Sequence, residues 1–217
     1  MSQPAPRISA ASKAFDLISQ NILAGKYLPG MILEEQFLVA ETGVSRTPIR
    51  EALFRLQADS YVELEARRGA QVKKITVVEL REVYETRLVI ESAAMRRICE
   101  HCLPIPPTAD AISRQQQAAK EDDDWVAFGG LDQEFHAEIV KASGNTTLYN
   151  LYQSLRPLHV RIAIRAIQES PSRAATINQE HNKILTSLRE CDIDTALTCL
   201  KEHLMDVPEV INALSAG

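Results

Sequence analysis

The chain has 217 residues, of which 45% are hydrophobic, and its formal net charge at pH 7 is −5. This length and composition suit one large or two modest domains with a packed core, and no apolar run approaches the roughly 20 residues needed to cross a membrane. The N-terminus, MSQPAPRISA, lacks the apolar core of a signal peptide, so we expect a cytoplasmic protein with no membrane partner. In that compartment the four cysteines are expected to be free thiols.

Charge is distributed unevenly along the chain. Residues 1–78 carry 10 Lys and Arg against 8 Asp and Glu, a balance of +2, whereas residues 79–217 carry 14 against 21, a balance of −7. This asymmetry predicts two domains, 1–78 and 79–217, with different partners. The excess of +2 is by itself only a weak indication of DNA binding.

The first domain begins with two predicted helices. Residues 9–24 have helical spacing and end at Gly25, and a turn at Pro29-Gly30 follows. A short second helix is predicted over residues 34–41.

The stretch GVSRTPIREALFRL, residues 43–56, predicts a turn and a third helix. Gly43 can supply the positive φ of a tight turn, and either Ser45 or Thr47 can cap the helix. One arc of this helix is apolar, formed by Ile49, Ala52, Leu53 and Leu56. Arg46, Thr47 and Arg50 lie outside that arc. The stretch is either an ordinary amphipathic surface helix or the recognition helix of a helix-turn-helix, whose N-terminal residues reach base edges in the major groove.

A β-hairpin is predicted after the third helix. Two short alternating runs flank a turn that contains Arg67, Arg68 and Gly69. A charged hairpin tip alone is more often a solvated turn, but beside three helices it predicts a winged helix-turn-helix. Arg67 and Arg68 could then contact backbone phosphates, and Gly69 would allow a close approach to a groove.

Residues 15–73 resemble the DNA-binding domain of the GntR family of bacterial transcription regulators. The matching residues are Ile22, Gly25, Pro29-Gly30, Leu33, Leu38, the run 43–53, Arg55, Leu56 and Gly69. The resemblance implies that double-stranded operator DNA is a partner, with the wing in its minor groove, and that the protein associates with the nucleoid. The candidate DNA-binding residues are Ser45, Arg46, Thr47, Arg50, Arg55, Arg67, Arg68 and Gly69.

Residues 79–217 predict an all-α bundle of about six helices, so the whole protein is expected to be mainly α. Thr76 and Glu79 fit a capping box that opens a long helix ending before Pro104. Pro208 is expected to kink or shorten the last helix. The other helices are predicted at 109–120, 123–142, 146–168, 173–190 and 193–214.

Three histidines lie on apolar faces of three different predicted helices. They are His136, His181 and His203, and Asp132 lies one turn before His136. Three imidazoles and one carboxylate can bind a divalent metal, with zinc favoured and nickel, manganese or iron also suitable. A lone histidine on an apolar face is more often a core residue, and spacing does not establish that the three helices converge.

The second domain resembles the ligand-binding (FCD-type) domain of the FadR subfamily of GntR regulators, and its helix number is closest to the VanR-like branch. The matching segments are Tyr84-Glu85-x-Arg87-x3-Glu91, Asp132-x2-Phe135-His136, Ala142–Asn145, Glu180-His181 and His203-Leu204. The resemblance implies that Asp132, His136, His181 and His203 hold a metal beside a cavity for a small carboxylate effector.

Arg87 is the main candidate for binding that effector, because an arginine on the inward face of a helix suits a carboxylate. The equally weighted alternative is a salt bridge to Glu91, four residues later. Weaker candidates for the cavity wall are Tyr84, Arg161, Arg165 and Asn178.

The segment Cys99-Glu100-His101-Cys102 contains a C-x-x-C, which can be a redox or zinc motif. It lies at a predicted helix end without a second C-x-x-C, and Cys191 and Cys199 do not complete a usual pattern. We therefore expect these cysteines to be packing or incidental thiols.

The resulting hypothesis is a homodimeric regulator that binds a palindromic operator and responds to a carboxylate at its metal site. One alternative is a regulator with a purely structural metal. A second, disfavoured alternative is a metallohydrolase, since Asp132 would already be a ligand and no H-E-x-x-H motif occurs.

Overall fold

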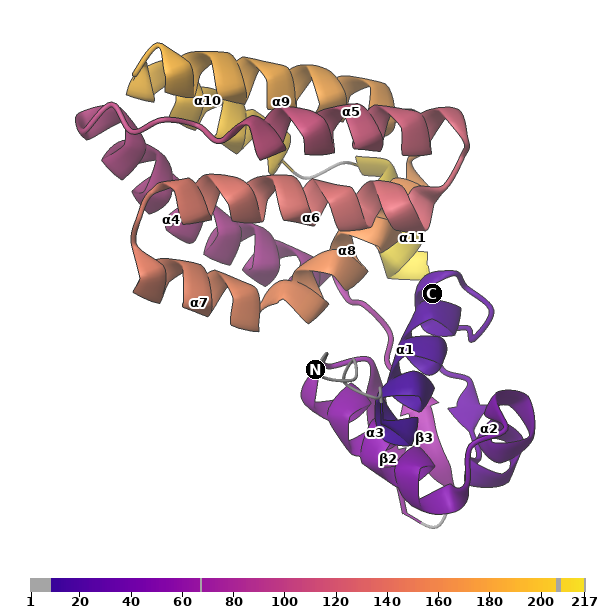
Figure 1. The fold of residues 1–217 in the computed structure, drawn as a ribbon. Coiled ribbons are helices and arrows are strands. Elements are labelled where there is room, and N and C mark those ends of the chain that lie inside the picture. Colours follow the sequence, from indigo (N-terminus) through magenta and orange to yellow (C-terminus); the bar gives the residue numbers. More distant parts are fainter. Residues whose placement is uncertain (1–8, 67, 206–207, 217) are drawn as a thin grey trace, which may run out of the picture. The chain divides into compact units, whose positions relative to one another are not determined.

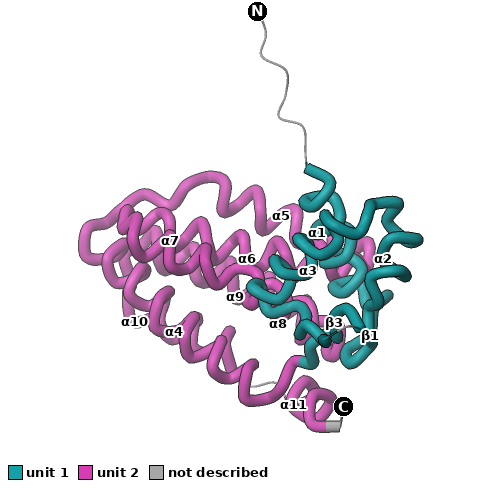
Figure 2. Tube along the Cα trace, turned by 90° about the horizontal axis from the view of Figure 1, so that it is seen from below, with its two compact units in different colours: residues 1–74 teal, residues 75–217 magenta. Residues whose placement is uncertain are grey.

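The computed structural model describes residues 9–66, 68–205 and 208–216. The chain forms two compact units, residues 1–74 and 75–217, which Figures 1 and 2 show. Within the described ranges, no helix is both long and apolar enough to cross a membrane.

Unit 1 is a winged helix-turn-helix, as the sequence predicts. Its elements are α1 (Ala10–Leu23), β1 (Ile32–Leu33), α2 (Glu35–Thr42), α3 (Arg46–Ala58), β2 (Val62–Glu65) and β3 (Gly69–Val72). The three strands form an antiparallel sheet in the order β1-β3-β2. Strand β1 was not expected, because a two-residue strand offers no alternation to detect.

The turn before α3 follows the predicted chemistry. Gly43 ends α2 with a φ of 66°, and Ser45 is the N-cap residue of α3, although its side chain makes no capping hydrogen bond. The expected apolar arc of α3 is buried in the core of unit 1 together with residues of α1 and the sheet. The opposite face of α3 is therefore exposed.

Gly69 is required for a reason that the sequence did not reveal. Its φ is 111°, and a Cβ at this position would collide with the backbone carbonyl oxygen of Leu33 in β1. Only glycine tolerates both conditions. Gly69 thus allows β1 and β3 to pair closely, and its approach to a nucleic-acid groove stays a prediction.

Unit 2 is all-α over its described residues, which confirms the predicted class. Its helices are α4 (Val77–Glu100), α5 (Pro107–Glu121), α6 (Trp125–Ala142), α7 (Thr146–Ser154), α8 (Arg156–Glu169), α9 (Arg173–Arg189), α10 (Ile193–His203) and α11 (Pro208–Ala216). Two expected helices are each divided. Pro157 lies in the first turn of α8 and Pro208 begins α11. A proline has no backbone N–H, and in the first turn of a helix that group would have no helical partner, so proline can begin a helix but not continue one.

Helix α6 lies at the centre of unit 2 and packs against α4, α5, α7 and α8 (Figure 1). Gly129 permits the close contact with α8, because a Cβ there would lie 2.9 Å from the backbone nitrogen of Ile164. Phe128, Phe135 and Ile139 are buried on the inward face of α6. That face also carries Asp132 and His136, so the helix delivers both into the interior.

The expectation of four free thiols is wrong for two cysteines. Cys102 and Cys191 form a disulfide with a Cα–Cα distance of 5.8 Å, whereas Cys99 and Cys199 are free and buried. Cys102 follows the end of α4 and Cys191 follows the end of α9, both with positive φ. Sequence spacing could not reveal the pair, since the two residues are 89 positions apart.

The disulfide yields a test by reduction. It closes a long loop, so opening it should destabilise unit 2 by up to about 4.6 kcal/mol, which lowers Tm by roughly 10 °C. Cys102→Ser under oxidising conditions should melt like the reduced wild type. Thiol titration in denaturant without reductant should find two thiols, and a result of four would contradict the pairing.

Candidate metal centre and recognition helix

Four buried side chains converge in unit 2: Asp132 and His136 from α6, His181 from α9 and His203 from α10. One ligand atom from each lies within 4.8 Å of all the others. Nε2 of His136 is 3.1 Å from Nε2 of His203, and Nε2 of His181 is 3.3 Å from Oδ1 of Asp132. The structure therefore brings together the four residues that the resemblance implied.

Each histidine has an oxygen acceptor at its other ring nitrogen. Nδ1 of His203 is 2.9 Å from Oε2 of Glu180, Nδ1 of His181 is 3.0 Å from Oε1 of Gln116, and Nδ1 of His136 is 2.7 Å from Oε2 of Glu91. These oxygens favour a proton on Nδ1 in all three rings. The three Nε2 atoms then direct their lone pairs toward Asp132 and toward one another.

This arrangement fits a metal ion. With Nδ1 protonated, the Nε2 lone pairs of His136 and His203 face each other at 3.1 Å and repel, and a cation between them would remove that repulsion. Ligand atoms about 2.0–2.2 Å from a tetrahedral zinc are about 3.3–3.6 Å apart. The His136–His203 and His181–Asp132 separations of 3.1 and 3.3 Å are near this range, and the widest separation in the cluster is 4.8 Å. Phe135 stacks on the ring of His181 at a centroid distance of 4.0 Å and helps to fix its orientation.

The electrostatics of the cluster favour metal-competent protonation states. Burial lowers the pKa values of His136, His181 and His203 by more than the neighbouring carboxylates raise them, so the imidazoles are neutral. Burial alone would raise the pKa of Asp132, but the hydrogen bond with His181 and the nearby histidines hold that pKa well below its usual value. A neutral imidazole and an ionised carboxylate are the forms that bind divalent metals.

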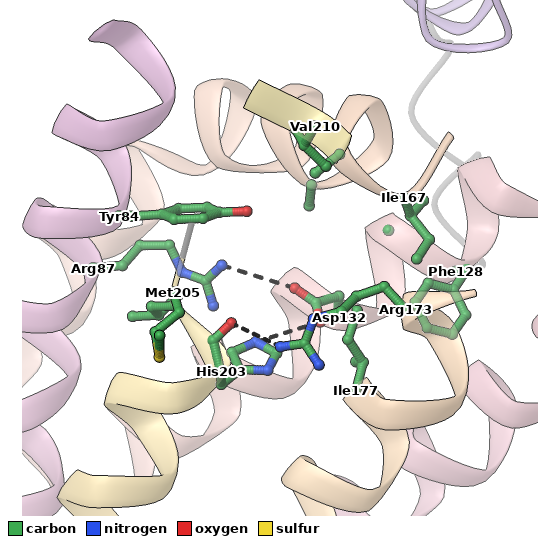
Figure 3. Close-up of a pocket in the computed structure, with 14 residues that line it drawn as sticks. Tyr84, Arg87, Phe128, Asp132, Ile167, Arg173, Ile177, His203, Met205 and Val210 are labelled. Atoms are coloured by element: carbon green, nitrogen blue, oxygen red, sulfur yellow. Dashed lines mark hydrogen bonds and ion pairs between the residues drawn. The ribbon is translucent and has the colours of Figure 1, made fainter. Parts of the chain in front are cut away.

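A cavity of about 50 Å³ adjoins the cluster (Figure 3). Asp132 and His203 line it together with Tyr84, Arg87 and Arg173, and apolar residues such as Phe128 and Val210 complete the wall. The cavity is therefore polar on the side of the histidines and apolar elsewhere.

Arg87 forms one of the two contacts that the sequence left open, and its position is compatible with the other. Its Nε donates to Oε1 of Glu91 at 2.8 Å, and its Nη1 is 3.9 Å from Oδ2 of Asp132. Its Nη2 is buried without a hydrogen-bond partner. Arg87 thus forms the salt bridge with Glu91 and still has a donor available at the cavity.

The weaker effector candidates differ in position. Tyr84 lines the cavity, but Arg161, Arg165 and Asn178 are not among the lining residues. Arg161 lies 3.9 Å from Glu79, Arg165 pairs with Glu169, and Asn178 donates to Gln117.

The sequence reasoning missed Arg173. This arginine lines the cavity, donates to both carboxylate oxygens of Glu180 at 2.7 and 2.9 Å, and donates to the backbone oxygen of His203 at 3.3 Å. Arg173 and Glu180 are two helical turns apart, so the spacing of seven was an available signal. Gln116 gave no comparable signal, because its partner lies on another helix.

In unit 1, the exposed side of α3 carries Ser45, Arg46, Thr47 and Arg50. Arg46 and Arg50 line an open groove of about 520 Å³ with Arg68 and Gly69 of the hairpin. Nε of Arg50 donates to Oε1 of Glu35 at 2.7 Å. Helix and wing therefore form one concave surface.

The two remaining DNA-binding candidates are Arg55 and Arg67. Arg55 is held against α1, with its guanidinium 4.3 Å from the ring centroid of Phe15 and its Nη1 bonded to Ser12. Arg67 lies outside the described residues.

The chain is similar to known protein families and to individual transcription regulators. Residues 10–72 match the family described as "Bacterial regulatory proteins, gntR family", and residues 82–206 match the FCD domain. The gluconate operon transcriptional repressor of Bacillus subtilis is 28% identical, and the match covers 97% of this chain and 90% of that protein. The transcriptional repressor RspR of Escherichia coli is 22% identical, with 92% and 88% covered.

Solved structures share the fold. A putative GntR regulator from Rhodococcus has a TM-score of 0.73 at 20% identity, with 95% of this chain and 98% of that chain covered. Escherichia coli McbR/YncC has a TM-score of 0.72 at 21% identity, with 96% and 98% covered. The protein is a DNA-binding transcription regulator and not an enzyme, which removes the metallohydrolase alternative. The chain belongs to the GntR family of bacterial regulators and, through its FCD domain, to the FadR-like subfamily.

Proposed function

We propose that a small carboxylate, bound beside a divalent metal ion in unit 2, controls operator binding by unit 1. The observation that carries this proposal is the pair of incomplete groups at one cavity. The Nε2 atoms of His136, His181 and His203 converge on Asp132, and Nη2 of Arg87 is a buried donor without a hydrogen-bond partner. A metal cation would satisfy the first group, and an anion would satisfy the second.

Asp132, His136, His181 and His203 would hold the metal, and zinc suits three imidazoles and one carboxylate. The bound ion would supply positive charge that attracts a carboxylate oxygen. Nη2 of Arg87 would donate to the same carboxylate, and Tyr84 would lie beside it in the cavity wall. The carboxylate would be fixed by two positive groups in a region of low dielectric constant.

The effector class follows from the cavity and from a relative. The lining of the cavity suits an acid, because Arg87 offers it a buried cationic donor. The Bacillus subtilis relative is named as the repressor of a gluconate operon. A small hydroxy acid of the gluconate class is therefore the first effector to test.

We further propose that two copies of the chain bind the two half-sites of a palindromic operator. Each winged helix-turn-helix unit binds one half-site, so an operator with twofold symmetry requires a dimer. The effector can control DNA binding only if it binds more tightly to one arrangement of the two DNA-binding units than to the other. Arg46, Thr47 and Arg50 on α3 would contact base edges and phosphates, with Arg68 at the backbone.

Metal binding can be tested by replacing one ligand. Wild-type protein should bind one zinc ion per chain, and His136→Ala should lose it. At a free zinc concentration 1,000 times Kd, the metal should add about 4 kcal/mol to the stability of unit 2. Metal analysis and thermal melts with and without a chelator measure both effects. His101→Ala, at an exposed histidine outside the cluster, is the matched control, and equal zinc content in both variants would refute the site.

Operator contact can be tested at α3. The Arg50 side chain is 62% exposed, so its removal should not disturb the core. Arg50→Ala should weaken binding to an operator selected from random DNA by roughly 5- to 150-fold. Arg114→Ala removes an equal charge from unit 2 and should bind normally. If Arg50→Ala binds like wild type in a titration by fluorescence anisotropy, the assigned contact is wrong.

Carboxylate binding separates this proposal from a purely structural metal. Gluconate should raise the Tm of the zinc-loaded protein by several degrees and leave the chelated protein unchanged. Glucitol, which lacks the carboxylate, is the matched control ligand and should give no shift. A screen in which no carboxylic acid shifts the Tm of zinc-loaded protein would favour the structural metal.

A further inference from the structure

We propose that Glu91 and Glu180 are positioning residues that link the metal ligands to the arginines of the cavity. Each carboxylate is shared between one metal-binding histidine and one cavity-lining arginine. The proposal deepens the proposed function and rests on its metal site. Its distinct content is that one carboxylate sets both the tautomer of a histidine and the position of an arginine.

Glu91 forms the first shared contact. It is fully buried on α4, and its Oε1 accepts hydrogen bonds from Nε of Arg87 at 2.8 Å and from the hydroxyl of Tyr152 at 3.0 Å. Its Oε2 lies 2.7 Å from Nδ1 of His136. One carboxylate therefore contacts side chains from α4, α6 and α7.

Glu180 forms the second shared contact, on α9. Its Oε1 accepts from Nη1 of Arg173 at 2.7 Å. Its Oε2 accepts from Nη2 of Arg173 at 2.9 Å and lies 2.9 Å from Nδ1 of His203. The pattern of Glu91 is repeated with a different histidine, a different arginine and a different helix.

The tautomer explains why these carboxylates matter to the metal. Without an acceptor at Nδ1, His203 could place its proton on Nε2 and donate to Nε2 of His136, 3.1 Å away. That hydrogen bond would occupy two of the lone pairs that the metal requires. Glu91 and Glu180 oppose this state, because each keeps the proton of its histidine on the outer nitrogen.

The same carboxylates explain the arginines. Arg87 is 3% exposed, and a buried guanidinium requires a paired charge. Glu91 binds Nε, which leaves Nη2 without a partner in the part of the cavity that Arg87 lines. Glu180 binds both Nη atoms of Arg173 and fixes it in the opposite part of the wall (Figure 3). Metal affinity and the placement of the two arginines thus depend on the same two carboxylates, those of Glu91 and Glu180.

Glutamine is the informative replacement. A carboxylate has two acceptor oxygens, whereas an amide has one acceptor and one donor group. Gln at position 180 could therefore keep its oxygen toward His203 only by turning its NH2 group toward Nη1 of Arg173, where two donors would face each other. Glu180 is better suited to the test than Glu91, because its side chain is 12% exposed and its replacement disturbs the core less.

The experiment measures zinc affinity of the full chain by competition with a chromophoric chelator. Glu180→Gln should weaken zinc binding about 10- to 100-fold. Arg173→Gln should not weaken it, since Glu180 still accepts from His203. The double variant should bind zinc more tightly than Glu180→Gln, because the single amide oxygen is then free for His203. The gain in zinc affinity from replacing Arg173 should therefore be larger in the Glu180→Gln background than in the wild-type background.

Glu190→Gln, at an exposed position just after α9, is the matched control and should bind zinc like wild type. Thermal melts of the zinc-free variants report folding separately. Zinc affinity of Glu180→Gln within twofold of wild type, or a factor for Arg173→Gln that is the same in both backgrounds, would overturn the inference. Wild-type protein that binds no zinc would instead overturn the proposed function as well.

Discussion

The interior of unit 2 holds a set of ionisable side chains that can exist in a helical core only if they satisfy one another. Asp132, Glu91 and Arg87 are almost fully buried, and so are two of the clustered histidines. Removing such charges from water costs several kcal/mol each unless partners are supplied at short range. The central position of α6 supplies these partners, because it places Asp132 and His136 close to side chains from α4, α9 and α10.

This constraint gives the fold its functional character. A core built only for stability would place apolar side chains at these positions, because buried ion pairs contribute little net stability. The polar centre brings the Nε2 atoms of three histidines together beside Asp132 and leaves one guanidinium donor without a hydrogen-bond partner. Such incomplete groups are the features that a bound ion and a bound anion complete, and a ligand held there can alter the packing of several helices at once.

Much of this could be predicted from the sequence, and particular residues show why. Gly43 and the apolar arc of α3 encode the recognition helix, since turn conformation and helical periodicity are local properties. Asp132 and His136 share a face because they are four residues apart. Pro157 shows the limit of that reasoning, because it lies in the first turn of α8 where a single helix over 146–168 was expected, whereas the effect of Pro208 on the last helix was anticipated.

The two domain classes, the family and the residue types at both sites could be predicted from the sequence, since these follow from local pattern and motif order. Tertiary packing was needed to show that three helices converge on one point, that Glu91 and Glu180 each meet a histidine and an arginine, and that Cys102 meets Cys191. The structure also assigned Gly69 to the pairing of β1 with β3. These contacts join residues on different elements, and their distances depend on how the helices and strands pack, which no spacing along the chain encodes.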